Sequence, residues 1–298
     1  MAQPALLACD WGTTNLRAWT LDAEGAVMAE REFPLGVSRL GAGEAEGRFQ
    51  REVRPALGAE RLPAILCGMV GSNLGWRAVT YADCPAGLFD LAAALTEVAP
   101  GVRIVPGLRC QGIAGAPDVI RGEETQILGW LAARRDRQQG RIVLCHPGTH
   151  AKWVLIEDGR IVRFVTAMTG ELFALLSQHS VLKSDAPAED EDAFDAGLAA
   201  AGDGGALAAR LFTARSRVVG GEAEAASTPS YLSGLLIGAE VAAVPQQLGE
   251  RPARVVLLGD AALCARYQRA LERSGIEVET FDGIAAAVAG LFALGYRS

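Results

Sequence analysis

The chain has 298 residues, of which half are hydrophobic and 21% are charged, and its formal net charge is −7. This composition is typical of a globular protein and excludes a disordered chain or a small disulfide-stapled domain, and at about 150 residues per domain the length predicts two domains. The acidic balance argues against nucleic acid as a partner, because proteins that bind phosphate backbones normally carry a positive charge.

No run of 18 apolar residues occurs, so we expect no membrane-spanning helix. The first residues contain no basic stretch, which argues against a secretory signal. The six cysteines form no CxxC pair and the three histidines are scattered, so zinc-site spacing is absent. We expect these cysteines to be reduced and buried.

The first segment predicts three strands joined by tight turns. A short apolar run, ALLACD, enters a turn at Gly12–Asn15, and an alternating run follows at 16–21. An acidic turn at Asp22–Gly25 then leads into a third run that begins at Ala26. Alternation on either side of tight turns is typical of a β-meander.

The same pattern returns near the middle of the chain. The segment 141–149 reads RIVLCHPGT and is followed by an apolar strand and an Asp158–Gly159 turn. Gly12 and Gly148, the glycines of the two Gly-Thr pairs, lie 136 positions apart. This spacing is too long for a solenoid repeat. It therefore predicts two related domains, although similarity by chance between two hairpins remains the alternative.

The remaining segments alternate between expected strands and helices. Strands are expected at 64–67, 102–105, 254–258 and 277–281, of which 254–258 should be buried. Helices are expected at 123–133, 261–274 and 284–294, with a helix-rich region over 171–241. Gly275 should end the helix before it. The acidic stretch 184–195 is expected to be a solvated loop or helix start. Together these elements predict an α/β fold.

The turn after the first strand carries residue types that suit a phosphate and its metal ion. Asp10 ends a buried strand, where a carboxylate is costly unless it binds a cation or accepts hydrogen bonds. Gly12 lets the backbone approach a ligand closely, and Thr13 and Thr14 offer hydroxyls and N–H groups. An ordinary polar hairpin turn is the competing interpretation.

Two later elements extend this interpretation. Gly148 and Thr149 repeat the Gly-Thr pair without an acidic residue, and two such turns could hold a polyphosphate from both sides. Gly259 and Asp260 follow a buried strand and open a helix, so that a flat base could pack against the backbone there. For Gly259 and Asp260, a plain strand-to-helix turn is the alternative.

These three elements resemble the superfamily of sugar kinases, heat-shock chaperones and actin-like ATPases, in which they are the two phosphate loops and the adenosine motif. Several stretches look like the 2-dehydro-3-deoxygalactonokinase (2-keto-3-deoxygalactonate kinase) family more closely. They are CDWGTTNLRAW, CGMVGSNLGW, PDVIRGEETQILG, PGTHAKWV and MTGELFALLSQHS. The resemblance runs from Ala8 to about Gly290, and RGEETQ and PGTHAKW are its most specific motifs.

The resemblance implies an α/β fold of two ribonuclease H-like domains, the actin-like ATPase fold, with an interdomain cleft. Residues 1–118 would form the substrate-side domain, and 119–298 the domain with the adenosine site, with the final helix returning to the first domain. The implied reaction uses ATP and Mg²⁺ to phosphorylate 2-dehydro-3-deoxy-D-galactonate at its 6-hydroxyl. It belongs to galactonate catabolism in the cytoplasm. Homodimer formation stays open.

A base for the attacking hydroxyl must be a carboxylate near the γ-phosphate. The candidates are Glu123 and Glu124, because related sugar kinases place a Gly-Asp pair before a helix at this chain position. Asp118 is a third candidate, for the base or for substrate binding. The alternative is that both glutamates merely favour the N-terminus of their helix. Asp10 is the candidate metal-linked carboxylate.

The substrate is an anion with several hydroxyls, so it needs cations and polar partners. Arg17 and Arg121 are the best-placed cations, and Ser72 and Asn73 are candidates for hydroxyl contacts, with Trp76 as a wall of the pocket. Lys152 and His150 are candidates for phosphate contacts. Each has a plainer alternative, such as a strand surface, the core or a turn cap.

Two other classes of function stay open at this point. One is another kinase of the same superfamily, acting on a hexose, an amino sugar or 2-keto-3-deoxygluconate. The other is a nucleotide-dependent switch or filament protein, for which 298 residues leave little chain for interaction domains. A sugar-binding regulator is disfavoured because no basic stripe is visible.

Overall fold

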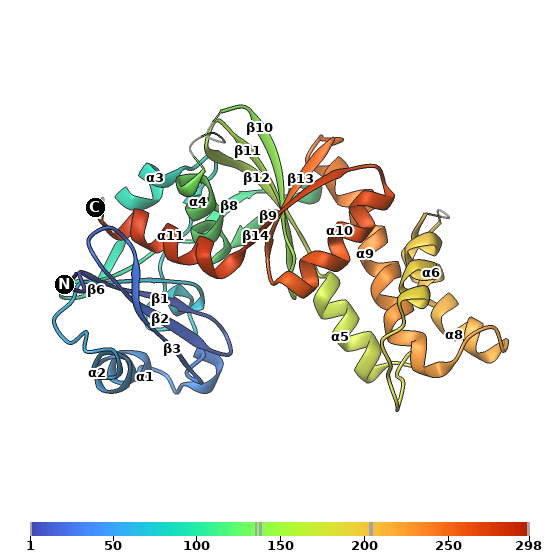
Figure 1. Ribbon diagram of the computed structural model, residues 1–298, viewed down its shortest axis with the longest axis horizontal. Coiled ribbons are helices and arrows are strands. Elements are labelled where there is room, and N and C mark those ends of the chain that lie inside the picture. Colours follow the sequence, from blue (N-terminus) through green and yellow to red (C-terminus); the bar gives the residue numbers. More distant parts are fainter. Residues whose placement is uncertain (1, 135, 137–138, 203–204, 297–298) are drawn as a thin grey trace. The chain divides into compact units, whose positions relative to one another are not determined.

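A six-stranded mixed sheet organises the first part of the chain (Figure 1). Its strands pair in the order β3-β2-β1-β4-β7-β6. The predicted meander is confirmed, since β1, β2 and β3 are successive antiparallel neighbours, while β4 and β7 continue the sheet parallel to β1. The bounds are β1 Leu6–Trp11, β2 Leu16–Leu21, β3 Val27–Phe33, β4 Ala64–Cys67, β6 Thr96–Ala99 and β7 Val102–Ile104.

A second sheet repeats this arrangement with five strands in the order β12-β11-β10-β13-β14. Its first three strands in sequence again lie side by side, and β13 pairs parallel with β10 as β4 does with β1. The repeated sequence pattern thus corresponds to a repeated strand order. The bounds are β10 Arg141–His146, β11 Ala151–Glu157, β12 Arg160–Ala167, β13 Arg254–Gly259 and β14 Glu277–Asp282.

The computed structural model describes residues 2–134, 136, 139–202 and 205–296. The chain divides into a first unit, Met1–Arg141 with Ile156–Arg163 and Asp282–Ser298, and a second unit, Ile142–Leu155 with Phe164–Phe281. This division differs from the domain boundary expected between residues 118 and 119, and that boundary stays a prediction. Within the described ranges, no helix is both long enough and apolar enough to cross a membrane.

The first unit also holds a small sheet that was not predicted, together with helices and short turns. A small sheet of three strands, β5 Ala82–Asp83, β8 Leu108–Gln111 and β9 Pro117–Ile120, precedes the helix that starts at Glu123. The helices are α1 Glu44–Arg48, α2 Arg54–Ala56, α3 Leu88–Ala93, α4 Glu123–Ala133 and α11 Gly283–Tyr296, with a π-helical turn at Phe49–Val53. Short 3-10 turns lie at Val37–Arg39, Met69–Gly71 and Ile113–Gly115.

Helix α11 packs closely against α4 within this unit, and Figure 1 shows it beside that helix. A Cβ on Gly129 would lie 2.0 Å from the Ala286 carbonyl oxygen, and one on Gly290 would lie 2.0 Å from the Thr125 carbonyl oxygen. Only glycine fits at both positions, so the small residues of the last helix allow the two backbones to touch. The packing of α11 thereby stabilises the start of α4.

The second unit contains the predicted helix-rich region. Its helices are α5 Thr169–His179, α6 Glu191–Ala201, α7 Leu207–Leu211, α8 Thr213–Val219, α9 Thr228–Gln247 and α10 Ala261–Arg273, with a 3-10 turn at Ala225–Ser227. Gly275 has a φ of +75°, which confirms the predicted helix stop. The acidic stretch is a helix start, as expected: Asp190 accepts from the Ala193 N–H at 2.8 Å and caps α6.

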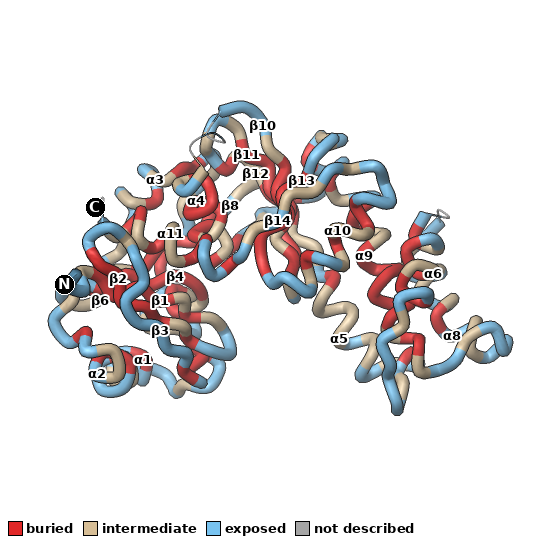
Figure 2. Tube along the Cα trace, in the orientation of Figure 1, coloured by how far each residue is buried: buried red, intermediate tan, exposed pale blue. Residues whose placement is uncertain are grey.

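Buried residues concentrate in the inner strands of both sheets and in the helices beside them (Figure 2), whereas β3, β6 and β14 are mostly exposed or half-buried. All six cysteines are free thiols, and Cys9, Cys67, Cys145 and Cys264 are buried as expected. The expectation was wrong for Cys84 and Cys110, which are half-buried on or beside the small sheet. The strands of the small sheet are two to four residues long, so neighbouring segments leave part of their surface exposed.

Candidate active site

Three segments of the first unit meet at the end of β1. Asp10 lies beside Cys67 in the parallel pairing of β1 with β4. A Cβ on Gly68 would lie 2.8 Å from the Trp11 carbonyl oxygen and 3.1 Å from Asp10 Oδ1. A Cβ on Gly122 would lie 3.2 Å from the Gly68 Cα, and Gly122 also has a φ of +112°. The glycines therefore let the start of α4 approach the ends of both strands.

This convergence places Asp10 near the carboxylate of Glu123. Burial, together with the negative charge of Glu123, raises the pKa of Asp10 to about 6, while Arg17 and a hydrogen bond with Cys67 oppose the shift. The two carboxylates repel each other where the end of β1 meets the start of α4, and together they create a negative electrostatic potential there. A cation would lower the energy of both.

Glu123 and Glu124 differ sharply in their surroundings. Glu124 is 0% exposed, and its Oε2 accepts from the Gly122 N–H at 2.7 Å while its Oε1 accepts from the Thr125 hydroxyl at 3.0 Å. Burial and the neighbouring Glu123 raise the pKa of Glu124 to about 7. Glu123 is only half-buried, and its Oε2 accepts from the Arg121 N–H at 3.1 Å. Glu124 thus organises the start of α4, and Glu123 is the member of the pair that solvent can reach.

The other carboxylate candidate, Asp118, lies on β9. Its Oδ1 accepts from the Val119 N–H at 2.8 Å, and it faces Cys110 across the small sheet. Arg121 follows the same strand and connects it to the loop after β4. Its Nη2 donates to the Val79 carbonyl at 2.8 Å, and its guanidinium lies 4.3 Å from the centre of the Tyr81 ring.

The loop after β4 holds the other predicted substrate contacts. A Cβ on Gly71 would lie 2.8 Å from Arg121 Nη1, so the structure brings Arg121 to the loop that carries Ser72 and Asn73. Asn73 is exposed and Ser72 half-buried. Trp76 packs 5.5 Å from the Phe49 ring at the edge of the core, which matches its plainer interpretation.

The first Gly-Thr turn is held by the segment after β3. The Gly12 carbonyl accepts from the Val37 N–H at 3.1 Å, and the Thr13 carbonyl from the Ser38 N–H at 3.1 Å. Thr13 and Thr14 are exposed. Arg17, the neighbour of Asp10 in β2, forms an ion pair with Glu32 at 3.2 Å, with both side chains about half exposed. The turn is therefore rigid on its carbonyl side.

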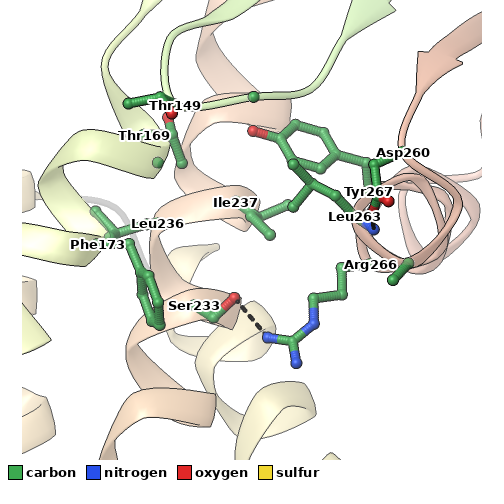
Figure 3. Close-up of a pocket in the computed structure, with 13 residues that line it drawn as sticks. Thr149, Thr169, Phe173, Ser233, Leu236, Ile237, Asp260, Leu263, Arg266 and Tyr267 are labelled. Carbon is green, nitrogen blue, oxygen red and sulfur yellow. Dashed lines mark hydrogen bonds between the residues drawn. The ribbon is translucent and has the colours of Figure 1, made fainter. Parts of the chain in front are cut away.

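A separate cavity of about 340 Å³ lies within the second unit (Figure 3). The second Gly-Thr turn, α5, α9 and α10 all contribute to its walls. Its size is in the range of small-molecule sites. The lining residues are Gly148, Thr149, Thr169, Gly170, Phe173, Ser233, Leu236, Ile237, Asp260, Ala262, Leu263, Arg266 and Tyr267.

Three of the predicted residues meet at this cavity. Gly148, Thr149 and Asp260 all line it. Gly259 lies next to the second turn, since a Cβ there would be 3.6 Å from the Pro147 carbonyl oxygen. Asp260 caps α10, where its Oδ1 accepts from the Leu263 N–H at 2.9 Å. The second turn and the element after β13 are therefore neighbours within one unit.

His150 and Lys152 do not line the cavity. His150 contacts the carboxylate of Glu171 at the exposed start of α5. Lys152 is 4% exposed, and its Nζ donates to the His150 carbonyl at 2.6 Å. Both contacts stabilise the second turn. For His150 this matches the plainer interpretation of a turn cap, whereas Lys152 is buried and is not the strand-surface residue of its plainer interpretation.

Sequence reasoning missed a buried carboxylate behind the cavity. Glu240 is 5% exposed in α9 and accepts from Trp153 Nε1 at 2.6 Å and from the Tyr267 hydroxyl at 2.8 Å, with Thr169 as a further partner. Burial raises its pKa, against the effect of these bonds. A single acidic residue inside an apolar helix was the available signal. Glu240 joins α5, β11 and α10 around the cavity.

Replacing Glu240 by alanine is expected to cost about 2–5 kcal/mol of unfolding free energy, because buried donors lose their acceptor and a cavity opens. Urea denaturation measures this. Glu272→Ala is the matched control, since Glu272 is exposed on α10 and its side chain accepts an exposed hydrogen bond from Gln268. Equal stability of the two variants would show that the buried bonds contribute little.

Among the described residues, no group of three or more histidines, cysteines, aspartates or glutamates could hold a metal ion. A site with fewer carboxylates can still hold a cation whose remaining ligands are phosphate oxygens and water. Mg²⁺ is commonly bound in this way, through one or two carboxylates and the phosphates of a nucleotide.

Comparison with known proteins gives a consistent result. The model of the 2-keto-3-deoxy-galactonokinase family matches residues 10–294. The chain is 37% identical to 2-dehydro-3-deoxygalactonokinase of Escherichia coli (strain K12), over 96% of this chain and 95% of the relative. A Rhizobium meliloti (strain 1021) protein whose name refers to the same activity is 38% identical over 96% of this chain and 95% of its own.

A solved structure also matches nearly the whole chain. It is the crystal structure of a Sinorhizobium meliloti protein whose name again refers to 2-dehydro-3-deoxygalactonokinase. The TM-score is 0.82 at 34% identity, and the match covers 97% of each chain. The similarity thus extends to both units and to every segment that contributes to the candidate site.

Proposed function

The chain belongs to the 2-keto-3-deoxy-galactonokinase family, and from this premise we propose that it transfers the γ-phosphoryl group of ATP to the 6-hydroxyl of 2-dehydro-3-deoxy-D-galactonate. The products are ADP and the 6-phosphate, and the reaction serves galactonate catabolism. The observation that carries the proposal is the match to a relative named for this activity over 96% of the chain.

The nucleotide occupies the cavity of the second unit in this proposal. Its phosphates lie toward Gly148 and Thr149, and its nucleoside toward the apolar side chains of α9 and α10. The support is that the second Gly-Thr turn and Asp260 line one cavity. N–H groups of a Gly-Thr turn suit phosphate oxygens, and a carboxylate beside them suits ribose hydroxyls.

Glu123 is the base of the proposed reaction. It takes the proton from the 6-hydroxyl while that oxygen forms a bond to the γ-phosphorus and the bond to the ADP oxygen breaks. The half-buried position of Glu123 supports this role over Glu124, whose two oxygens already accept hydrogen bonds in a fully buried position. Glu124 is then a positioning residue for the start of α4.

Asp10 would hold the Mg²⁺ that accompanies ATP. The fit rests on the repulsion between Asp10 and Glu123, which a divalent cation would relieve. When bound, Mg²⁺ neutralises charge on the phosphate oxygens. Thr13 and Thr14, exposed in the adjoining turn, donate to the same phosphate oxygens in this proposal.

Arg121 is the proposed partner of the substrate carboxylate. Its Nε and Nη1 are buried and have no hydrogen-bond partner among the described residues, so that the stacked guanidinium keeps unused donors. Ser72, Asn73 and Asp118 supply hydroxyl contacts. Arg17 would have to exchange its exposed ion pair with Glu32 for the substrate, an exchange that costs little at the surface.

The ribonuclease H-like classification of both halves is part of the proposal. Its support is the shared strand order, with three meander strands followed by a strand parallel to the first. The reaction further requires that a shared cleft between the expected domains, 1–118 and 119–298, exclude water during transfer, which limits ATP hydrolysis.

A substrate panel tests the proposed function directly. ADP release is measured with 2-dehydro-3-deoxy-D-galactonate, its gluconate epimer, hexoses, N-acetylated amino sugars and no acceptor. We expect the highest kcat/KM for the galactonate derivative, and phosphorus NMR should show a 6-phosphate. A higher kcat/KM for a hexose, or ATP hydrolysis that needs no acceptor, would contradict the proposal.

A further inference from the structure

The cavity of the second unit has two chemically different ends. Figure 3 shows Thr149 and Thr169 on one side and Ser233 with Arg266 on the opposite side. The first end belongs to the Gly-Thr turn, to which the proposed function assigns the phosphates. The polar side chains of the second end, Ser233 and Arg266, come from α9 and α10, and nothing in the sequence motifs accounts for them.

Ser233 and Arg266 are joined by a hydrogen bond across this second end. Arg266 Nη1 donates to the Ser233 hydroxyl at 3.2 Å, and Ser233 is 7% exposed. A buried hydroxyl that faces a cavity is costly unless a partner satisfies it. The arginine therefore fixes the serine and also contributes its own charge to the cavity.

Arg266 is held loosely enough to bind a ligand. Its Nη2 donates at 3.3 Å to Glu189, whose side chain is 88% exposed, and such surface pairs contribute little. Its guanidinium also lies 5.8 Å from the centre of the Phe194 ring. A guanidinium carries five N–H donors, and the contacts with Ser233 and Glu189 use only part of them.

The walls between the two ends are apolar. Phe173, Leu236, Ile237 and Leu263 are among the residues that line the cavity, and Figure 3 shows Ile237 near the middle and Phe173 beside Ser233. A flat aromatic base can pack against such walls, and its polar edge must then face Ser233 and Arg266. The arginine only donates hydrogen bonds, whereas the serine hydroxyl can donate or accept.

We propose that Ser233 and Arg266 are specificity-determining residues that recognise the edge of a purine base. This inference rests on the proposed function, because it takes the cavity as the nucleotide site. A purine offers a ring-nitrogen acceptor to the arginine and a large face to the apolar walls. Beside that nitrogen, adenine carries an amino donor and guanine a carbonyl acceptor.

The serine hydroxyl accepts from the adenine amino group or donates to the guanine carbonyl, so neither purine leaves a polar group unpaired. The site should accordingly select purine over pyrimidine nucleotides and discriminate weakly between ATP and GTP. A site that needed a particular donor or acceptor there would reject the wrong purine strongly.

Nucleotide binding without any sugar acid tests the inference, so that its outcome is independent of the phosphoryl acceptor. Calorimetric titrations compare ATP, GTP, UTP and CTP for the wild type, Arg266→Gln, Ser233→Ala and Arg269→Gln. Arg269 is the matched control. Its guanidinium also lies 5.8 Å from the Phe194 ring centre, but it pairs with Glu191 and Asp195 and does not line the cavity.

For the wild type we expect Kd values of ATP and GTP within about tenfold of each other, and pyrimidine nucleotides bound at least tenfold more weakly. Arg266→Gln should weaken the binding of ATP about 10-fold to 100-fold, because one charged hydrogen bond is lost. The same variant should lose most of the preference for ATP over UTP. Ser233→Ala should reduce the same preference. Arg269→Gln should keep it, and thermal unfolding verifies that each variant is folded.

Two results would overturn the inference. One is equal binding of UTP and ATP by the wild type. The other is an unchanged ATP-to-UTP ratio in both folded variants, Arg266→Gln and Ser233→Ala. If the base preference behaves as expected but no sugar acid is phosphorylated, the proposed function fails and the recognition of purines stands.

Discussion

Replacing Asp10 by asparagine is expected to lower kcat by about three orders of magnitude while the protein stays folded. Asparagine keeps the shape of the side chain but removes the charge that would hold Mg²⁺ and its phosphates. Losing one group that stabilises charge in a transition state typically costs about 10²-fold to 10³-fold. Coupled measurement of ADP release with the galactonate derivative gives the rate.

The pKa of Asp10, which is raised to about 6 in the folded protein, predicts the stability of the Asp10→Asn variant. An unfolded aspartate ionises near pH 3.9. Between these values the folded state binds the extra proton, so ionisation destabilises the fold as pH rises and the full cost is present above about pH 6. Asp10→Asn removes that cost, and at pH 8 the variant should be at least as stable as the wild type.

Asp83→Asn is the control, because Asp83 pairs with Arg109 on the exposed edge of the small sheet in the same unit. The kcat of the Asp83→Asn variant should change less than about twofold, because an exposed ion pair contributes little energy. Full activity of a folded Asp10→Asn variant would remove Asp10 from the proposed metal site. Loss of folding would instead show that its role is structural.

Glu123→Gln should lower kcat by about 10²-fold to 10⁴-fold, the usual contribution of a general base. Nucleotide binding should persist, because Glu123 does not line the cavity of the second unit. Glu124→Gln is the matched variant on the next residue. Since a glutamine can still accept from the Gly122 N–H and stays neutral, kcat should fall less than tenfold.

Single-turnover measurements separate the chemical step from binding and product release for both variants. The contrast between the two neighbours decides the assignment. If Glu124→Gln loses more kcat than Glu123→Gln, the buried carboxylate is the base and the start of α4 must open for the reaction. If neither variant loses activity, Asp118 is the next candidate to replace.

The elements that local patterns predicted are confirmed closely. Alternating apolar residues and turn glycines predicted the first meander, and the strand expected at 64–67 is β4. The helix expected at 123–133 has those bounds, and Gly275 ends α10. Periodicity and turn chemistry are local properties, so they can be recognised in the sequence alone.

The small sheet and the buried Glu240 were not predicted, for a different reason. The strands β5, β8 and β9 are two to four residues long, and unlike the equally short β4 they are not continuous buried apolar runs. The apolar sequence around Glu240 is a signal of burial, but only packing shows that Trp153 and Tyr267 are its partners. Short elements and buried polar groups depend on partners far apart along the chain.

The α/β class, the repeated Gly-Thr hairpin and a short set of carboxylates that are candidates for the base can all be recognised in the sequence. Only the tertiary structure separated Glu123 from Glu124, because burial and hydrogen bonds are properties of the packed state. It also brought Gly148 and Asp260 to one cavity and set Ser233 and Arg266 at its far end. Local patterns fix what each segment is, whereas the chemistry of a site depends on which segments meet.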